Sequence, residues 1–196
     1  MPVLSVAWPP APLTTERLVL RKPEASDRSG LIELLCSEDV RRFLGGPRPR
    51  EAVEAMPEVP ADHPGVFAVE RDGCFVGAVT IDRRDPDRLG HLDAAGGELE
   101  VSYAFLPAYW GQGLAFEAVE AALEWARNRF PEEPVLLVTQ VANARSMALA
   151  ARLGFTEHAR FVEHGAEQWL GVRWPTGREA PAISATMPHG LRPPLP

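Results

Sequence analysis

Two neighbouring groups of residues in the middle of the chain have types and spacing that suit chemistry. The first is a pair of carboxylates, Glu98 and Glu100, which alternate with apolar residues in a segment that runs to Leu106. Period-2 alternation predicts a half-buried strand, so both carboxylates belong to its polar face. A carboxylate in that position can act as a general base. An ordinary solvent-facing strand face explains the pair as well, and the spacing does not choose between Glu98 and Glu100.

The second group is a glycine-rich turn. Pro107 removes a backbone donor and ends the strand. Gly111 and Gly113 then precede a run from Ala115 in which apolar residues recur at helical spacing. Glycines at a helix start let the backbone approach a ligand, and the free N–H groups there bind phosphate. Each charged hydrogen bond contributes about 1.5–3 kcal/mol, and the helix dipole adds about 0.3–1 kcal/mol. The turn predicts a pyrophosphate site, although a tight strand-to-helix turn explains the glycines too.

Three motifs in this order resemble the GNAT superfamily of N-acyltransferases, most closely the branch of ribosomal-protein N-terminal acetyltransferases. The family's acyl-CoA loop has the pattern Q/R-x-x-G-x-G/A, which falls on Trp110 to Ala115. The resemblance covers about Thr14 to Trp174. The matching segments are Glu16–Arg21, Glu100–Tyr103 with Pro107 and Tyr109–Ala115, and Asn143 and Ser146 with Leu153–Phe155.

The resemblance implies an α/β (α+β) fold with a mixed, mostly antiparallel sheet flanked by helices. The sheet is expected to splay between strands Glu98–Leu106 and Val135–Val141, where the arm of acetyl-CoA, or of another acyl-CoA, would enter as co-substrate. The cofactor-binding residues that the resemblance implies are Phe105, Leu106, Trp110, Gly111, Gln112, Gly113, Leu114, Ala115, Phe116, Asn143 and Ser146.

Acyl transfer from a thioester to an amine needs a neutral amine and a proton for the departing thiolate. Neutrality at pH 7 costs about 1 kcal/mol for an α-amino group of pKa about 7.7, and about 4.6 kcal/mol for a lysine of pKa about 10.4. Proximity of two bound substrates can contribute about 7–11 kcal/mol, so the base need not be strong. The resemblance selects Glu100 as that base, with Glu98 as its rival. Many relatives place a tyrosine at the position of Ala150, so Ser146 is the alternative proton donor.

The loop also departs from the family pattern. Trp110 and Gln112 stand where family loops often carry Arg or Lys, and Phe116 stands where relatives commonly have Thr. Phosphate binding is then expected to rely on backbone N–H groups, with Arg145 as a distant supplement. Replacement of Gln112 by Arg is expected to tighten CoA binding and to steepen its salt dependence.

Other elements follow from local patterns. Asp72-Gly73 predicts a type I′ hairpin turn, and the polar connection Asp82–Gly96 is expected either to be mobile or to overhang the acceptor site. The predicted strands are Arg17–Arg21, Val66–Arg71, Cys74–Ile81, Val135–Val141, Phe155–Val162 and Glu167–Trp174. One predicted helix follows a cap at Ser26 or Asp27. The others span Glu38–Leu44 after a cap at Ser37, Glu51–Met56, and Asn143–Leu153, which Asn143 can cap.

The 196 residues suit one domain, expected at 14–174, with an N-terminal arm at 1–13 and a proline-rich tail at 175–196. The tail has the composition of a disordered segment, with docking on the body or on a second subunit as the alternative. A homodimer is therefore left open.

The net charge of −7 argues against a nucleic-acid partner and favours a cationic acceptor. Cys36 and Cys74 lack metal or disulfide spacing, and the five histidines form no metal-ligand pattern, so no metal is expected. The chain shows no leader pattern and no apolar run of membrane-spanning length, so the cytoplasm is the expected location and no membrane partner is expected.

The sequence therefore predicts an enzyme, an acyl-CoA-dependent N-acyltransferase (EC 2.3.1.-) that works by direct transfer in a ternary complex. Neither cysteine lies near the motif, which disfavours a covalent intermediate. The acceptor is a protein N-terminus or a small-molecule amine. The first alternative is a catalytically inactive acyl-CoA sensor, suggested by Ala150 and Phe116. The second is an interaction module whose glycine turn binds nothing.

Overall fold

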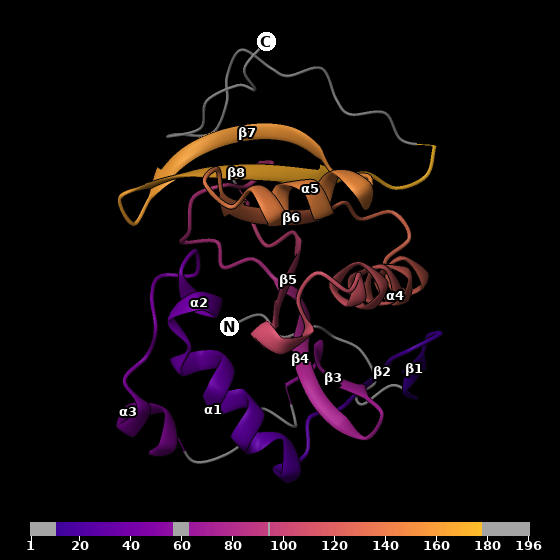
Figure 1. The fold of residues 1–196 in the computed structure, drawn as a ribbon. Coiled ribbons are helices and arrows are strands. Elements are labelled where there is room, and N and C mark those ends of the chain that lie inside the picture. Colours follow the sequence, from indigo (N-terminus) through magenta and orange to yellow (C-terminus); the bar gives the residue numbers. More distant parts are fainter. Residues whose placement is uncertain (1–10, 57–62, 94, 178–196) are drawn as a thin grey trace. The chain divides into compact units, whose positions relative to one another are not determined.

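The computed structural model describes residues 11–56, 63–93 and 95–177 (Figure 1). Most of the expected arm and of the expected tail, residues 1–10 and 178–196, lies outside the described residues. The chain forms two compact units. In the described residues, the N-terminal unit comprises 11–82 and 102–124, and the C-terminal unit comprises 83–101 and 125–177.

Eight strands are hydrogen-bonded in the order β1-β2-β3-β4-β5-β6-β8-β7. Strand β5 (Leu99–Phe105) contributes its first three residues to the C-terminal unit and the rest to the N-terminal unit. Its pairing with β6 (Val135–Gln140) is parallel and joins Leu99 to Val135 and Glu100 to Leu136 at the start of both strands. The other register pairs within the units are antiparallel. The predicted mixed, mostly antiparallel sheet is confirmed.

In the N-terminal unit, strands β1 (Leu13–Thr14), β2 (Val19–Arg21), β3 (Val66–Arg71) and β4 (Cys74–Arg83) form an antiparallel series. The β3–β4 turn is the predicted one, with Asp72 and Gly73 both at positive φ, +51° and +76°. The unit's helical segments are η1 (Ala25–Asp27), α1 (Arg28–Cys36), α2 (Glu38–Arg41), α3 (Arg50–Glu54) and η2 (Pro107–Tyr109), with the first part of α4 (Leu114–Arg129).

Helices α1 and α2 pack against strands β4 and β5 through a small apolar cluster. Leu34, Val40 and Leu106 are its buried members. Ser37 caps α2 as predicted, because its hydroxyl accepts a hydrogen bond from the N–H of Val40 at 3.3 Å. Helix α2 ends at Arg41 rather than at the predicted Leu44. The Gly45-Gly46 pair that follows is at positive φ, which breaks the helical path.

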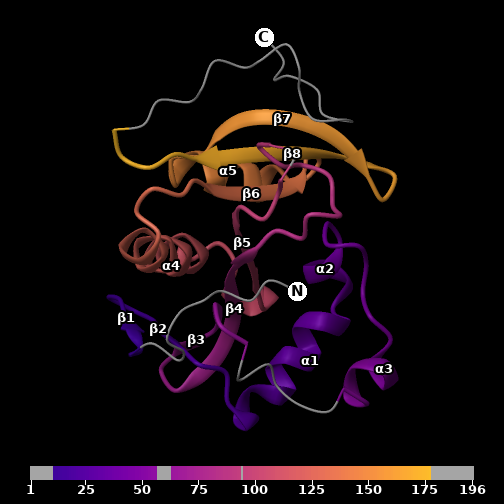
Figure 2. The same cartoon turned by 180° about the vertical axis from the view of Figure 1, so that it is seen from behind.

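In the C-terminal unit, β6 pairs with β8 (Ala166–Arg173) and β8 pairs with β7 (Thr156–Glu163), both antiparallel. Helix α5 (Ala144–Arg152) covers one face of these strands (Figure 1; Figure 2 shows the reverse side). One core cluster of this unit comprises the buried residues Leu136, Ala159, Phe161, Leu170 and Val172.

The connection between β4 and β5 differs from a simple polar loop. Strand β4 continues through Arg83, two residues beyond the predicted end, and the connection then holds two buried polar side chains, Arg84 and His91. They are 1% and 6% exposed, respectively, so this segment is fastened to the C-terminal unit rather than left in solvent. No helix in the described ranges is both long and apolar enough to cross a membrane.

Candidate active site

The residues that the sequence selected for chemistry divide between the two units. The N-terminal unit holds residues 105–116, which end β5 and lead through the glycine turn into α4. The C-terminal unit holds Glu100, Asn143 and Ser146.

The glycine turn has the backbone geometry that its glycines predict. Gly111 and Gly113 lie at φ values of +74° and +78°, a region that other residues avoid, and α4 begins directly afterwards at Leu114. Within the described part of the chain, no backbone or side-chain acceptor contacts the N–H groups of residues 111–115. These amides are therefore not capped by described side chains, as a phosphate site at a helix start requires.

An arginine and a glutamate fasten the first turn of α4 to the segment before β2. The Glu117 carboxylate accepts hydrogen bonds from the Thr15 hydroxyl at 2.6 Å and from the backbone N–H and Nε of Arg17 at 2.8 and 2.7 Å. Burial alone would raise the pKa of Glu117, but the hydrogen bonds from Thr15 and Arg17 outweigh it and lower that pKa below its ordinary value. Nη1 of Arg17 also donates to the backbone carbonyl of Gln112 at 2.9 Å.

A second arginine reaches the same turn from the β3–β4 hairpin. Nη1 of Arg71 donates to Oε1 of Gln112 at 2.7 Å, while Nε2 of Gln112 donates to the carbonyl of Ala108 at 3.0 Å. Neither Arg71 nor Arg17 was among the predicted site residues. Arg17 lay inside the matched Glu16–Arg21 segment and Arg71 stood directly before the hairpin turn, but no sequence signal placed either of them beside Gln112.

The other predicted cofactor residues of this unit are partly committed to protein contacts. Phe105 and Leu106 are buried, and the N–H of Leu106 donates to the carbonyl of Val76 at 3.0 Å. The Trp110 side chain is 36% exposed, and its Nε1 donates to the carbonyl of Phe105 at 2.7 Å. Leu114 is buried, whereas Ala115 and Phe116 are half-buried.

In the C-terminal unit, Glu100 is held by the buried cation Arg84. Nη1 of Arg84 lies 2.9 Å from both carboxylate oxygens of Glu100, and Nε of Arg84 donates to the carbonyl of Leu89 at 3.0 Å. The Arg84 side chain is fully buried and the Glu100 side chain is 18% exposed. Glu100 is thus half-buried in an ion pair, and not the plain solvent-facing carboxylate that strand alternation suggests.

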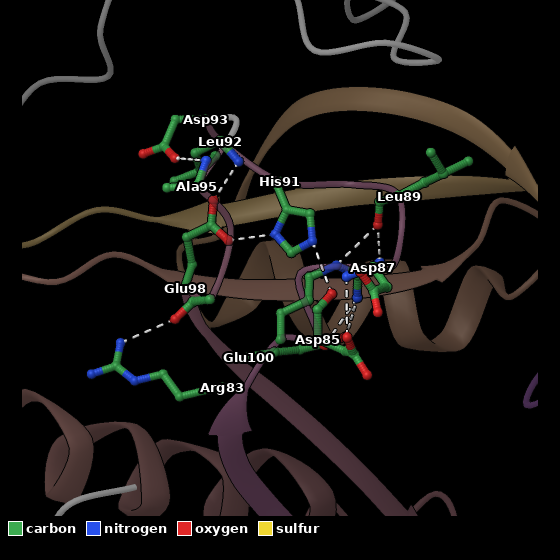
Figure 3. Close-up of polar contacts among 12 residues, drawn as sticks. Arg83, Asp85, Asp87, Leu89, His91, Leu92, Asp93, Ala95, Glu98 and Glu100 are labelled. Carbon is green, nitrogen blue, oxygen red and sulfur yellow. Dashed lines mark hydrogen bonds and ion pairs between the residues drawn. The ribbon is translucent and has the colours of Figure 1, made fainter. Parts of the chain in front are cut away.

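Glu98 has a different set of partners on the same loop (Figure 3). Its carboxylate lies 2.6 Å from Nδ1 of His91 and accepts the N–H of Leu92 at 2.5 Å. Nε2 of His91 lies 3.0 Å from the carbonyl of Asp85. These contacts tie Glu98 to the connection between β4 and β5, so both of its carboxylate oxygens already have protein donors or ring nitrogens beside them.

Asn143 and Ser146 lie at the start of α5. The side-chain oxygen of Asn143 accepts the N–H of Ser146 at 3.2 Å, which confirms the capping role, and its amide nitrogen donates to the Thr139 hydroxyl at 3.2 Å. Ser146 is 8% exposed and Ala150 has no exposed surface. Arg145 is exposed on the same helix.

The described residues contain no group of three or more His, Cys, Asp and Glu side chains arranged to hold a metal ion. Cys36 is half-buried and Cys74 is exposed, and both are free thiols.

Comparison with known proteins identifies the family. A model of the acetyltransferase (GNAT) domain matches residues 17–156. The structure is similar to a GNAT-family acetyltransferase from Bacillus anthracis, with 20% identity over 83% of this chain and 98% of that chain and a TM-score of 0.66.

Two further neighbours were solved with coenzyme A. Spermidine N-acetyltransferase from Vibrio cholerae, in complex with CoA and spermine, shares 16% identity over 83% of this chain and 98% of its own, with a TM-score of 0.66. Aminoglycoside acetyltransferase AAC(6')-Ib, in complex with coenzyme A, shares 17% identity over 80% and 94%, with a TM-score of 0.64. The neighbours confirm the predicted fold, and the match over residues 17–156 shows that this chain belongs to the family of GNAT acetyltransferase domains.

Proposed function

We propose that this GNAT domain transfers an acetyl group, or another acyl group, from CoA to a primary amine by direct transfer in a ternary complex. The observation that carries the proposal is the turn at Gly111 and Gly113. It has the positive φ values that the phosphate-binding geometry needs, and it presents amides that no described group caps. Because the turn lies inside the matched family domain, CoA is the ligand that best fits it.

Each candidate residue then has a chemical role. The amides of residues 111–115 would hold the diphosphate of acyl-CoA, which when bound supplies the activated thioester. Glu100 accepts the proton of the attacking amine, directly or through water. The hydrogen bonds from Arg84 leave acceptor sites on the Glu100 carboxylate free, because a carboxylate has about four lone-pair sites for donors. Ser146 donates the proton to the departing thiolate, since a buried Ala150 occupies the tyrosine position of many relatives.

The acceptor is a protein N-terminus or a small-molecule amine. The likeness of the sequence motifs to ribosomal-protein N-terminal acetyltransferases supports the first. Two structural neighbours named for spermidine and aminoglycoside acetylation support the second. An α-amino group is the easier nucleophile, since its neutral form costs about 1 kcal/mol at pH 7, against about 4.6 kcal/mol for a lysine-like amine. The net charge of −7 favours either cation by long-range attraction.

The test is turnover of acetyl-CoA with a panel of amines that contains N-terminal peptides, polyamines and aminoglycosides. The release of the free CoA thiol measures the turnover. Thiol release that depends on one acceptor class, with a matching mass increase on that acceptor, is the expected result. Intact-protein mass spectrometry in acetyl-CoA alone is expected to show no acylated protein. A stable acyl-protein that forwards its acyl group to the amine would overturn direct transfer.

A non-catalytic acyl-CoA sensor is the second candidate, and it is favoured by one observation. Ala150 is completely buried where many relatives place a tyrosine, so that hydroxyl donor is missing. A rise in melting temperature with CoA, combined with no thiol release for any amine, would favour the sensor. No CoA-induced stabilisation at all would favour an interaction module that binds no CoA.

A further inference from the structure

The glycine turn lacks a cation of its own, yet two arginines from elsewhere in the N-terminal unit contact its Gln112. Arg17 donates to the backbone carbonyl and Arg71 donates to the side-chain oxygen, at 2.9 and 2.7 Å. Residues 110–116 contain no Lys or Arg. The positive charge beside the turn therefore comes from residues that precede Gln112 by 95 and 41 positions.

The two arginines differ in how much of their charge is already neutralised. Arg17 forms a close ion pair with the Glu117 carboxylate, which lies 2.6 Å from Nη2 and also accepts from Nε. The Glu117 side chain is only 16% exposed, so this pair is poorly screened by water. Arg17 therefore links the segment before β2 to the first turn of α4, and its charge is largely neutralised by Glu117.

Arg71 has no such partner within the described residues. Its strong hydrogen bond goes to the neutral amide of Gln112, and its nearest carboxylate, Asp72, lies 3.5 Å from Nε. The Asp72 side chain is 89% exposed, and ion pairs of that kind contribute little because water screens them. The Arg71 side chain is itself 32% exposed, and its contacts in the described residues use Nη1 and Nε, so the other N–H groups of the guanidinium can serve a ligand at the turn.

We propose that Arg71 is a phosphate-binding residue for CoA. It supplies the positive charge that family loops often carry at the positions of Trp110 and Gln112. The side-chain oxygen of Gln112 accepts a hydrogen bond from the guanidinium and so holds it beside the turn. A guanidinium fork matches two oxygens of one phosphate, which a lysine cannot do. The phosphate belongs either to the diphosphate or to the 3′-phosphate of CoA. This inference rests on the proposed function, since it assumes that the turn binds CoA.

The experiment is calorimetric titration of CoA into the full-length protein at low and at high salt. Arg71→Ala is expected to raise the Kd for CoA about tenfold and to flatten its salt dependence. Arg71→Lys is expected to recover part of the loss, since it keeps the charge without the fork. Asp72→Asn removes the competing carboxylate and keeps a residue that tolerates positive φ, so it is expected to tighten binding about twofold.

Two controls separate this role from a structural one. Arg50→Ala removes an exposed arginine of the same unit that pairs with Glu54 in its own helix, and it is expected to leave the Kd unchanged. Binding of S-acetylpantetheine, which lacks every phosphate, is expected to be equal for the wild type and Arg71→Ala. A comparison of CoA with 3′-dephospho-CoA identifies the phosphate. If Arg71→Ala raises the Kd by the same factor for both ligands, Arg71 binds the diphosphate. If it leaves the Kd for 3′-dephospho-CoA unchanged, Arg71 binds the 3′-phosphate.

The outcomes keep the two proposals apart. Wild-type protein that binds CoA, together with Arg71→Ala that binds it with the same Kd and salt dependence, would overturn the role of Arg71 and leave the proposed function standing. An equal loss of S-acetylpantetheine binding in Arg71→Ala would also overturn it, because that effect would be structural. Wild-type protein that binds no CoA would overturn both.

Discussion

Arg84 carries a full charge on a side chain that has no exposed surface. A buried cation is tolerated when its donors are satisfied, and here Glu100 and the carbonyl of Leu89 accept from it while the ring of Phe161 lies 6.0 Å away. The connection between β4 and β5 looks uniformly polar in the sequence, but its Arg84 side chain is buried and holds the connection in place. Removal of one partner from such a pair leaves the other uncompensated, which is the costly case.

We therefore expect Arg84→Met to destabilise the protein strongly. Breaking a fully buried pair costs about 3–5 kcal/mol, and the cost here is expected below that range because Glu100 is partly exposed. The free energy of unfolding in urea measures it. Arg88→Ala is the control, since Arg88 pairs with Glu163 at 2.7 Å but is 45% exposed, and it is expected to cost about 1 kcal/mol or less. Equal losses for the two variants would contradict this account of Arg84.

The two strand carboxylates are expected to separate in their effects on turnover. Glu100→Gln keeps an oxygen that can accept from Arg84 but removes the base, so kcat is expected to fall about 100-fold or more while CoA affinity is kept. Glu98→Gln weakens the contact with His91 and is expected to lower stability and leave kcat close to that of the wild type. Steady-state kinetics with whichever amine of the panel proves to be an acceptor, and melting curves for both variants, measure these effects. Full activity in Glu100→Gln would end its assignment as the base.

At the scale of elements, the helix start at α4 depends on backbone conformation more than on space. A Cβ built on Gly111 meets no described neighbour within 4 Å, and one on Gly113 meets only the end of the Arg17 side chain at 3.5 Å. Both positions nevertheless lie at positive φ, which costs an ordinary residue about 1–2 kcal/mol.

Gly111→Ala and Gly113→Ala are accordingly expected to lower the free energy of unfolding by about 1–2 kcal/mol each and to weaken CoA binding. Asn tolerates positive φ better than Ala, so Gly111→Asn is expected to retain more of both properties. Urea unfolding and calorimetric CoA titration are the measurements. A Gly111→Ala variant with wild-type stability and affinity would show that the turn does not need its glycine conformation.

Elements with strong local signals are close to their predicted bounds. Strands β5 and β6 and the start of helix α4 agree within about two residues, which is the usual uncertainty of element ends. The two-residue strand β1 was missed, because a strand of that length has no periodicity to detect. Asp27, one of the two residues predicted to cap α1, is the N-cap residue, but its carboxylate accepts from Arg21 and forms no capping hydrogen bond with that helix. The partner of Asp27 is thus set by Arg21 of strand β2, whose position the local sequence around Asp27 does not predict.

At the scale of the whole molecule, several buried or hydrogen-bonded groups make folding depend on pH in the same direction. Burial lowers the pKa of His158 below its ordinary 6.5, so the folded protein favours the neutral ring. Burial alone would raise the pKa values of Asp27, Glu117 and Glu163. Hydrogen bonds, chiefly from Arg21, Thr15 with Arg17, and Arg88 respectively, outweigh it and lower all three.

Each of these groups binds protons more tightly in the unfolded chain, so stability falls as pH falls. The contribution of His158 is present above pH 6.5 and is lost as pH falls below it. The contributions of the carboxyl groups are present above their ordinary values of 3.8 and 4.5 and are lost as pH falls through their lowered ones.

We expect urea midpoints measured across this range to show a first decline below about pH 6.5 and a steeper one below about pH 4.5. His158→Gln removes the titrating ring and is expected to abolish the first decline only. A wild-type midpoint that stays constant between neutral pH and about pH 5 would contradict the effect of His158.

The sequence by itself determined the features that depend on short-range patterns. These are the alternating strand that carries Glu100, the glycine turn before α4, the Asp72-Gly73 hairpin and the Asn143 cap, each of which is set by residues only a few positions apart. The family motifs were read from the same short segments, so the family followed from the sequence as well.

Only the tertiary structure decided which side chains stand beside the chemical groups. Gln112 receives Arg71 and Arg17 from 41 and 95 positions away, and Arg84 reaches Glu100 by a turn of the chain that no local pattern encodes. Strand pairing and burial bring such residues together, and they determine which charges are neutralised and which remain available. The charge available to a phosphate and the partner of the proposed base are therefore properties of the fold.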